Sequence, residues 1–319
     1  MFRAALLYLS SASWARRLVT GWGFARRAAS RFIAGDTLAK ALEVIQRLNN
    51  NGLFTTLDHL GENVTKPEEA VRATDEYIEV LEQIDDTGVK SNISLKLTQL
   101  GMGLDFELCL ENMQCIAARA AEFGIMVRID MEDSSTVDRT IDIFRQLRQA
   151  GSTNVGLVFQ SYLYRTEKDL QAVLNEGASV RLCKGAYKEP PDVAFPRKAD
   201  VDANFDKLTA LLIDVAMATG SIPASPDGKV PPVTAIATHD EKRIAFAKSY
   251  AADTGFSMNA LEFQMLNGIR SDLQTQLASE GYPVRVYVPF GTEWYPYYVR
   301  RLAEHPANVY FFLSNLLRR

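Results

Sequence analysis

Three side chains near the end of the chain have the chemistry to bind a small acid. Tyr287 lies in an apolar, strand-like segment at 284–291, and Arg300 and Arg301 follow 13 and 14 residues later. Two guanidinium groups beside a strand end can hold a carboxylate through paired, charge-assisted hydrogen bonds. The pattern therefore predicts a site for a small carboxylic acid. The alternative is a solvated helix face on which Glu304 pairs with the arginines.

Most of the other apolar, strand-like segments also end in polar residues. The eight segments are 53–57, 92–97, 125–130, 154–160, 179–184, 233–239, 261–264 and 284–288. Seven of them carry polar side chains at or near the C-terminal end, namely Lys96, Asp130, Gln160, Arg181 with Lys184, His239, Glu262 with Gln264, and Tyr287. In a closed parallel barrel these ends meet at one mouth, where catalytic residues are found. The distribution therefore predicts one shared site.

Helical patterns separate these segments and predict how the strands are joined. They cover 38–48, 67–84, 106–123, 137–150, 167–176, 205–218, 241–252 and 269–280. Strands that alternate with helices of this length pair in parallel through right-handed crossovers, and eight such units can close into a (β/α)8 barrel. We therefore expect a barrel at 52–319 after an N-terminal helical arm at 1–51, with an open doubly wound sheet as the alternative.

Composition is that of an ordinary globular protein. The 319 residues are 47% hydrophobic and 23% charged, with a net charge of −4, which gives no general attraction to nucleic acid. Three irregularly spaced cysteines indicate a reducing compartment, so we expect a cytoplasmic location.

The first 35 residues contain six arginines and no acidic residue. A docked helical arm is the preferred interpretation, and a cleaved leader is an alternative. The combination of basic and apolar residues also suits contact with a membrane surface. The apolar run at 4–9 is too short to span a bilayer.

Several kinds of chemistry lack their sequence motifs. The three histidines and three cysteines form no spacing typical of a metal site, and the chain has no GxSxG, GxGxxG or Walker-type motif. Two enzyme classes remain on chemical grounds. One is a Schiff-base enzyme with Lys96 or Lys184 as the nucleophile, and the other is a cofactor enzyme in which these groups hold a ring system. A ligand-binding barrel without turnover is the non-enzyme alternative.

Residues 180–187 (VRLCKGAY) favour the cofactor enzyme, because they resemble the RLxKGAY signature of the proline dehydrogenases. The resemblance runs from about residue 37 to the C-terminus. Further matching segments are 58–62 (DHLGE), 94–97 (SLKL), 129–130 (ID), 160–162 (QSY), 237–239 (ATH), 262–266 (EFQML), 287–291 (YVPFG) and 297–304 (YYVRRLAE). The chain is similar to the short, monofunctional bacterial form, because it has no room for the aldehyde dehydrogenase half of the bifunctional enzymes.

This resemblance implies a fold and a reaction. The fold would be a distorted (β/α)8 TIM barrel with a C-terminal helix over the mouth and non-covalent FAD in it. The reaction would be oxidation of L-proline to Δ1-pyrroline-5-carboxylate, the first step of proline catabolism, by hydride transfer from proline C5 to flavin N5. Electrons would then pass to a membrane quinone, which requires peripheral contact with the inner face of the membrane.

The resemblance also implies roles for individual residues. The substrate-binding residues would be Arg300, Arg301 and Lys96 on the proline carboxylate, Tyr287 and Leu266 around its ring, Tyr297 at the rear wall, and Glu62 as a gate paired with Arg300. Asp130 would orient neighbouring polar groups. Arg181 would lie near flavin N5, where a fixed cation stabilises the charge that develops during hydride transfer.

The remaining residues would bind the cofactor. Gln160 would hydrogen-bond the pyrimidine side of the flavin, and the others would be Met131, Lys184, Gly185, Ala186, Thr238, His239 and Glu304, with Arg197 as a candidate for the phosphates. Gly185 would let the backbone approach the cofactor where a side chain would block it.

Overall fold

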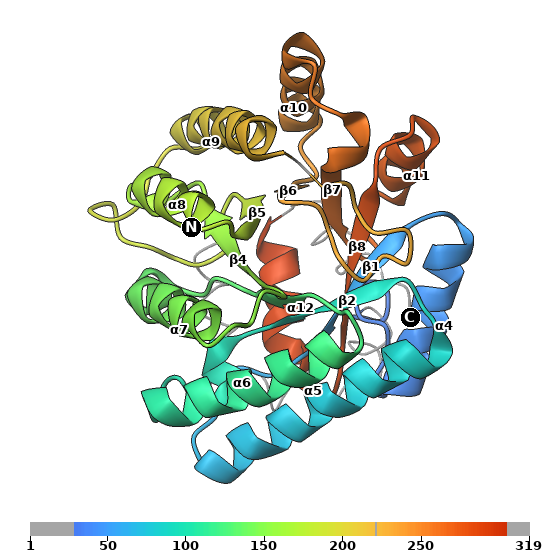
Figure 1. Cartoon of the computed structure of the whole chain (residues 1–319), viewed down its shortest axis with the longest axis vertical. Coiled ribbons are helices and arrows are strands. Elements are labelled where there is room, and N and C mark those ends of the chain that lie inside the picture. The colour runs from blue at the N-terminus through green and yellow to red at the C-terminus, as the bar shows by residue number, and fades with distance from the viewer. Residues whose placement is uncertain (1–28, 221, 305–319) are drawn as a thin grey trace, which may run out of the picture.

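Eight parallel strands close into one barrel in sequence order (Figure 1). The computed structural model describes residues 29–220 and 222–304. The strands are β1 (Phe54–His59), β2 (Ser91–Leu95), β3 (Val127–Ile129), β4 (Val155–Gln160), β5 (Ser179–Cys183), β6 (Thr234–Ala237), β7 (Leu261–Leu266) and β8 (Val284–Phe290). The pairing of β8 with β1, with Thr56 opposite Tyr287, completes the ring. The predicted barrel is therefore confirmed, and the open sheet is excluded.

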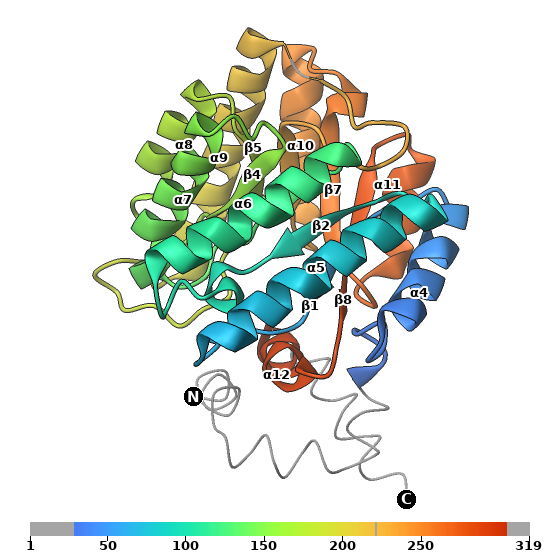
Figure 2. The same ribbon diagram turned by 60° about the horizontal axis from the view of Figure 1, so that its bottom comes forward.

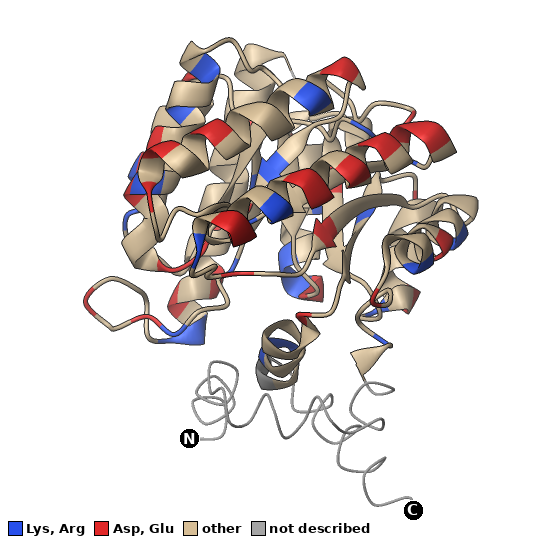
Figure 3. Ribbon diagram, turned by 90° about the horizontal axis from the view of Figure 1, so that it is seen from below, with Lys and Arg blue, Asp and Glu red and all other residues tan. Residues whose placement is uncertain are grey.

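The helices surround the barrel (Figure 1). They are α4 (Leu38–Asn50), α5 (Pro67–Thr87), α6 (Phe106–Glu122), α7 (Val137–Gln149), α8 (Thr166–Asn175), α9 (Lys198–Thr219), α10 (Glu241–Thr254) and α11 (Ser271–Ser279). In α5, Ala73, Tyr77 and Leu81 are buried at helical spacing, whereas acidic residues spread along the outside of this helix (Figure 3). Each helix thus covers the strands with one apolar face.

One helix begins earlier than its pattern predicts. The sequence predicted a helix at 205–218, but α9 starts at Lys198. The additional residues, 198–204, are mostly polar and small (KADVDAN), so they lack the apolar periodicity that marks the rest of the helix. Asp200 in the first turn suits the positive end of a helix dipole. Arg197 therefore caps a helix instead of lying in the preceding loop.

Helix α12 (Trp294–Glu304) follows β8 and lies across the end of the barrel at which the strands terminate (Figure 2). It packs against the short segment 29–36, where Phe32 is 1% exposed and its ring centroid lies 6.2 Å from that of Tyr298. The backbone N–H of Ala34 donates to Pro289 O at 2.8 Å. This segment and α12 therefore form a second apolar cluster beside the main core.

The structure describes residues 29–51 of the predicted N-terminal arm. Residues 1–28, on which the leader and membrane-contact interpretations depend, lie outside the described residues. Within the arm, α4 buries Ala41 and Ile45 and contacts β1 and β8. The domain boundary at 51 stays a prediction.

A candidate active site at the barrel mouth

Asp130, directly after β3, receives three hydrogen bonds from three other strands. Its Oδ1 accepts from Arg181 Nη1 at 2.8 Å and from Ser94 Oγ at 2.7 Å, and its Oδ2 accepts from Tyr287 OH at 2.8 Å. Lys96 Nζ lies 3.9 Å from the same Oδ2. Four residues predicted to share a site are therefore in one network, because parallel strands bring their carboxyl ends together.

Lys96 has a closer carboxylate partner in Asp58. The Lys96 Nζ to Asp58 Oδ2 distance is 3.0 Å, and Asp58 is fully buried. Burial by itself lowers the pKa of Lys96, but the charges of Asp58 and Asp130 outweigh it and raise this pKa above its ordinary value. A lysine held as an ammonium ion suits a carboxylate ligand. It is a poor Schiff-base nucleophile, which requires a neutral amine.

Tyr287 is held as a neutral hydrogen-bond donor. Burial and the nearby charge of Asp130 raise the pKa of its phenol well above the ordinary value. Leu266 stands opposite Tyr287 in the pairing of β7 with β8. The two residues predicted to wall a substrate ring are therefore neighbours on adjacent strands.

Arg181 is oriented by a chain of buried groups that extends into the barrel. Its Nε donates to Gln264 Oε1 at 2.5 Å, and Gln264 Nε2 donates to Glu262 Oε1 at 2.5 Å. Glu262 in turn accepts from Arg285 Nε and Nη2 at 2.9 and 3.1 Å. Among the described residues, the hydrogen bonds of Arg181 come from Nε and Nη1, so Nη2 is the nitrogen of this guanidinium that can serve a ligand.

Glu62 and Arg300 are joined, as the resemblance implied for a gate. Arg300 Nη1 and Nη2 donate to Glu62 Oε1 and Oε2 at 2.6 and 3.2 Å. Burial alone would raise the pKa of Glu62, but the charge of Arg300 lowers it below the ordinary value. The guanidinium carbon of Arg300 also lies 5.9 Å from the centroid of the Tyr187 ring. The pair bridges the loop after β1 and α12.

The second arginine of α12 is buried against an aromatic ring. Arg301 is 8% exposed, and its guanidinium carbon lies 4.9 Å from the centroid of the Tyr297 ring. A cation over an aromatic face is stabilised by the ring quadrupole. Arg301 and Tyr297, both predicted to contact substrate, are therefore neighbours. The side chain of Glu304, predicted to bind the cofactor, lies outside what the structure describes.

Gln160, at the end of β4, offers a hydrogen-bond acceptor to a ligand. Its Nε2 donates to Met131 O at 3.3 Å and to Glu132 O at 3.1 Å. Its Oε1 is buried and has no hydrogen-bond partner among residues 29–220 and 222–304. A buried acceptor left without a donor costs about 1–3 kcal/mol. A bound ring system with an N–H group would remove this cost.

Gly185 lies just after β5, the strand that pairs with β4. Its φ of +110° disfavours any side chain. A Cβ atom there would lie 2.3 Å from the ring of Tyr162. The missing side chain at Gly185 therefore leaves room for the ring of Tyr162, and a cofactor-binding role for Gly185 and the partly buried Ala186 stays a prediction.

The residues predicted on the cofactor from β5 and β6 have protein partners in this structure. Lys184 Nζ donates to Asp202 Oδ1 at 2.5 Å and to Asp240 Oδ2 at 2.7 Å. Burial opposes ionisation of Asp240, yet Lys184 dominates and lowers its pKa to about 2. His239 Nε2 accepts from the backbone N–H of Leu266 at 3.0 Å, and Thr238 Oγ1 accepts from that of Asp240 at 3.1 Å. These contacts order the loop after β6.

Arg197 is not part of the network around Asp130. It is exposed, and its guanidinium donates two hydrogen bonds to Asp200, both at 2.7 Å. It lines an open cavity of about 550 Å³ together with Tyr164 and Lys207. The structure therefore adds no support for a phosphate-binding role.

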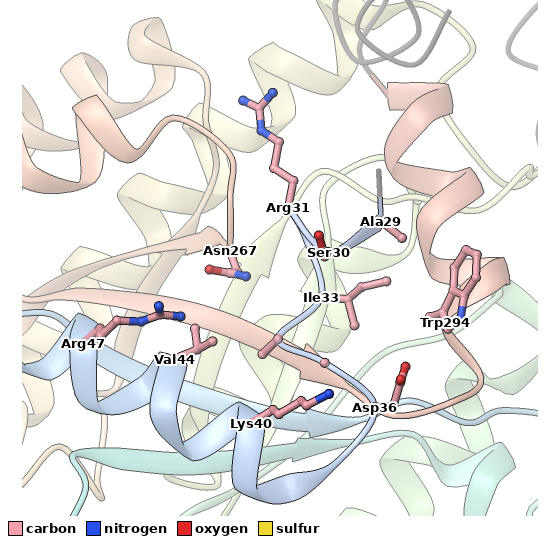
Figure 4. Close-up of a pocket in the computed structure, with 12 residues that line it drawn as sticks. Ala29, Ser30, Arg31, Ile33, Asp36, Lys40, Val44, Arg47, Asn267 and Trp294 are labelled. Carbon is pink, nitrogen blue, oxygen red and sulfur yellow. The ribbon is translucent and has the colours of Figure 1, made fainter. Parts of the chain in front are cut away.

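A further cavity, of about 450 Å³, lies between segment 29–36, α4 and the start of α12 (Figure 4). Lys40, Arg47, Asn267 and Trp294 line it. None of the predicted site residues does, so this cavity is separate from the network around Asp130.

Sequence reasoning assigned no role to several residues of the site. Asp58 and Ser94 fall within matching segments, but nothing in their type distinguished them from capping or surface residues. Thr98 and Glu132, which hydrogen-bond each other, stand outside the matching segments. Only Asp58 had a feature in the sequence that could have indicated a role in the site, because it directly follows the apolar run at 53–57.

The closed parallel barrel with an ionic cluster at its mouth places the chain among the (β/α)8-barrel enzymes. A family model for proline dehydrogenase matches residues 41–313. The chain therefore belongs to the proline dehydrogenase family of oxidoreductases, which act in the first step of proline catabolism.

Full-length relatives support the same assignment. The chain is 41% identical over 317 residues to proline dehydrogenase 2 of Bacillus subtilis (strain 168), covering 99% of each chain. It is 40% identical over 294 residues to the proline dehydrogenase of Deinococcus radiodurans, covering 91% of this chain and 90% of that one. The resemblance to the short, monofunctional type is thus confirmed.

Solved structures with the same fold are larger. Proline utilization A from Bdellovibrio bacteriovorus superposes with a TM-score of 0.77 at 24% identity, covering 88% of this chain and 33% of that one. The corresponding protein from Corynebacterium freiburgense gives 0.72 at 22% identity, covering 99% and 34%. The chain spans about a third of these proteins, and the likeness shows the fold.

Among residues 29–220 and 222–304, no helix combines the length and the apolar character needed to cross a bilayer.

Proposed function

We propose that this chain oxidises L-proline to Δ1-pyrroline-5-carboxylate with non-covalent FAD as the hydride acceptor. The observation that carries the proposal is the network around Asp130, in which Arg181, Tyr287 and Lys96 meet at the barrel mouth. It supplies fixed cations beside a neutral aromatic side chain, because the guanidinium carbon of Arg181 lies 5.4 Å from the centroid of the Tyr287 ring. Such an arrangement suits a small ring that bears a carboxylate.

The substrate carboxylate would be held by Lys96, Arg300 and Arg301. The charges of Asp58 and Asp130 keep Lys96 protonated, so it remains a cation throughout the neutral pH range. Arg300 is bound to Glu62 in this structure, and we expect this ion pair to stay closed as a gate over the bound carboxylate. Holding the reacting carbon in place lowers the activation barrier, because the loss of translational and rotational entropy occurs on binding and not in the transition state.

The cofactor would lie against Gln160, Met131, Gly185, Ala186, Thr238 and His239, with Lys184 nearby and Arg181 over its reacting edge. When bound, FAD accepts the hydride that leaves proline C5. The buried Oε1 of Gln160 and the Nη2 of Arg181, neither of which is hydrogen-bonded to a described residue, would gain partners on binding. Arg197 and Glu304 remain as candidates for the distal part of the cofactor.

Electrons would then pass to a membrane quinone. That step requires contact with the cytoplasmic face of the membrane. The basic N-terminal residues before position 29 have the composition for such contact.

The visible spectrum of the purified protein tests this proposal. We expect a yellow protein whose flavin absorbance bleaches when L-proline is added. Arg300→Met should retain flavin but require a proline concentration at least about tenfold higher for half-maximal bleaching, because a charged hydrogen bond contributes about 1.5–3 kcal/mol. Arg145→Met, which removes a surface partner of Glu176, is the matched control and should behave as wild type.

Other outcomes would separate the rivals. A colourless protein that borohydride traps on a lysine would indicate a Schiff-base enzyme. Proline binding without bleaching would indicate a binding protein. Equal proline requirements in wild type and Arg300→Met would reject the carboxylate clamp.

A further inference from the structure

The loop between β1 and α5 carries Glu62 and has an unusual backbone conformation. Asn63, the next residue, has a φ of +57° although it is not glycine. Only a few per cent of non-glycine residues adopt this region, and the surrounding structure must maintain it. The turn determines the direction in which Glu62 leaves the backbone, so whatever holds Asn63 also places the Glu62 carboxylate.

Thr98 holds this turn. It lies in a short 3-10 helix, η1 (Leu97–Leu100), that follows β2 and Lys96. The backbone N–H of Asn63 donates to Thr98 Oγ1 at 3.2 Å, and that of Val64 donates to Thr98 O at 3.3 Å. One threonine therefore accepts the two consecutive backbone N–H groups that follow Glu62.

Glu132 in turn holds Thr98. The Thr98 N–H donates to Glu132 Oε1 at 3.0 Å, and the Thr98 hydroxyl donates to Glu132 Oε2 at 2.6 Å. A hydroxyl has one proton and two lone pairs, so donation to Glu132 fixes its orientation and leaves a lone pair for Asn63. Glu132 is 4% exposed, and its backbone oxygen accepts from Gln160 Nε2.

These contacts form one continuous connection from a proposed cofactor-binding residue to the proposed gate. We propose that Thr98 and Glu132 are positioning residues that hold the loop after β1 so that Glu62 meets Arg300, and thereby set how tightly the closed site retains a carboxylate substrate. The inference rests on the proposed function, because it concerns the substrate gate of that same site.

The charge state of Glu132 controls the strength of this connection. Burial raises the pKa of Glu132 to about 7, whereas the two hydrogen bonds from Thr98 act in the opposite direction. Glu132 interacts electrostatically with four other titratable groups, namely Lys96, Glu62, Cys109 and Tyr187. Both carboxylate oxygens of Glu132 accept a hydrogen bond from Thr98. A proton bound to either oxygen would weaken one of these bonds, so the ionised form accepts both best. The connection is therefore strongest above about pH 7 and weakens below it.

A purely structural role is the rival explanation. In that case, Glu132 would only satisfy the free N–H at the start of η1, as a capping side chain does. Removal of the Thr98 hydroxyl would then lower stability without affecting a ligand. The two explanations differ in whether substrate binding changes.

The test compares Thr98→Val, which replaces the hydroxyl with a methyl group, with Thr98→Ser, which keeps the hydroxyl. Thr209→Val in α9 is the matched control, because this buried hydroxyl donates within its own helix to Phe205 O. The probe is tetrahydrofuran-2-carboxylate, in which oxygen replaces the ring N–H of proline, so that affinity is measured without turnover. We expect Thr98→Val to weaken its binding to the holoenzyme about threefold to tenfold, as loss of one hydrogen bond predicts, while the other two variants bind as wild type.

Amide hydrogen exchange of the segment around Asn63 gives a second measurement that does not depend on activity. Exchange should be faster in Thr98→Val and unchanged in Thr98→Ser and Thr209→Val. Equal probe affinity in Thr98→Val and wild type would overturn the inference, and so would equal weakening in Thr209→Val. If proline oxidation itself were absent, the exchange comparison would still show whether Thr98 holds the loop.

Glu132→Gln is a second variant that remains informative if Thr98→Val does not fold. In wild type, affinity for the probe should rise with pH across about pH 6 to 8, because Glu132 ionises over this range. In Glu132→Gln this dependence should disappear. An identical pH dependence in both proteins would contradict the proposed role of Glu132.

Discussion

At the scale of single residues, the site is a set of paired opposite charges from which water is largely excluded. Asp58 and Asp130 face Lys96, Asp130 also faces Arg181, and Glu62 faces Arg300. Buried ions are costly unless they are paired. Each pairing therefore fixes the position of the group that would contact substrate.

Asp58→Asn tests this dependence at Lys96. Breaking a buried ion pair by removing one partner costs about 3–5 kcal/mol, so we expect a lower free energy of unfolding at neutral pH in denaturant titrations. The pKa of Lys96 is raised in wild type and should fall in the variant. Lys96 would then lose its proton at a lower pH, and the proline requirement for flavin bleaching should rise with pH earlier than in wild type.

Asp85→Asn provides the control for Asp58→Asn. Asp85 pairs with Lys229 at 2.6 Å but is 40% exposed, and exposed pairs contribute about 0–1 kcal/mol. If both variants lost stability equally, or if Asp58→Asn kept the wild-type pH dependence, Asp58 would not control Lys96.

Asp58 also shows where sequence reasoning stopped. Seven predicted strands had polar residues near their ends, and only the first did not. That strand was predicted to stop at residue 57, but β1 continues to His59, so Asp58 is the polar residue near the end of this first strand. The pattern was therefore complete in the sequence. Asp58 was missed because the predicted end of this strand lay two residues before the observed end. A charged residue after an apolar run usually indicates that the strand has already ended.

At the scale of elements, β7 shows how a strand can serve both the core and the site. Its alternate residues Glu262 and Gln264 extend the chain of hydrogen bonds from Arg285 to Arg181, while Phe263 between them is fully buried with the apolar core. Period-two alternation follows from strand geometry. The sequence placed both polar residues on a strand, but it could not show that they contact each other and an arginine from β5.

Glu262→Gln tests the contribution of this strand to stability. Glu262 is fully buried and accepts from two nitrogens of Arg285, so the variant leaves a buried cation without its counter-ion. We expect the free energy of unfolding to fall by about 3–5 kcal/mol, measured by denaturant titration at pH 7.

A surface substitution of the same type is the comparison for Glu262→Gln. Glu176→Gln removes a partner from Arg145, where both side chains are more than a third exposed. Its effect should stay within about 1 kcal/mol. A similar loss in free energy of unfolding in the two variants would show that the buried Glu262–Arg285 pair contributes no more to stability than the exposed Glu176–Arg145 pair.

At the scale of the whole molecule, the alternation of helices and strands predicted the order of the elements and favoured a closed barrel, but it did not identify the contacts that close it. Alternating helices and strands restrict the chain to a few parallel topologies. The pairing of β1 with β8, and the packing of α12 across the mouth, depend on contacts between residues more than 200 positions apart in the sequence. Local periodicity carries no information about such contacts. For the same reason, the packing of segment 29–36 on α12 was not foreseen.

This packing joins the first described segment, 29–36, to α12, the helix that carries Arg300. Phe32 packs against Tyr298, and Asn267 Nδ2 donates to Phe32 O at 3.3 Å. Because α12 carries Arg300, a loosened contact at Phe32 should reach the substrate site. We therefore expect Phe32→Ala to lower the free energy of unfolding by about 3–5 kcal/mol and also to raise the proline concentration needed for half-maximal flavin bleaching.

Phe144→Ala separates these two effects. Phe144 is fully buried in α7, so its removal should cost a similar free energy of unfolding without loosening α12. Both measurements would be made on the flavin-loaded protein, below the temperature at which either variant begins to unfold. A higher proline requirement in Phe32→Ala alone would show that segment 29–36 helps to place Arg300. An equal rise in both variants would mean that general destabilisation explains the effect, and the proposed connection would fail.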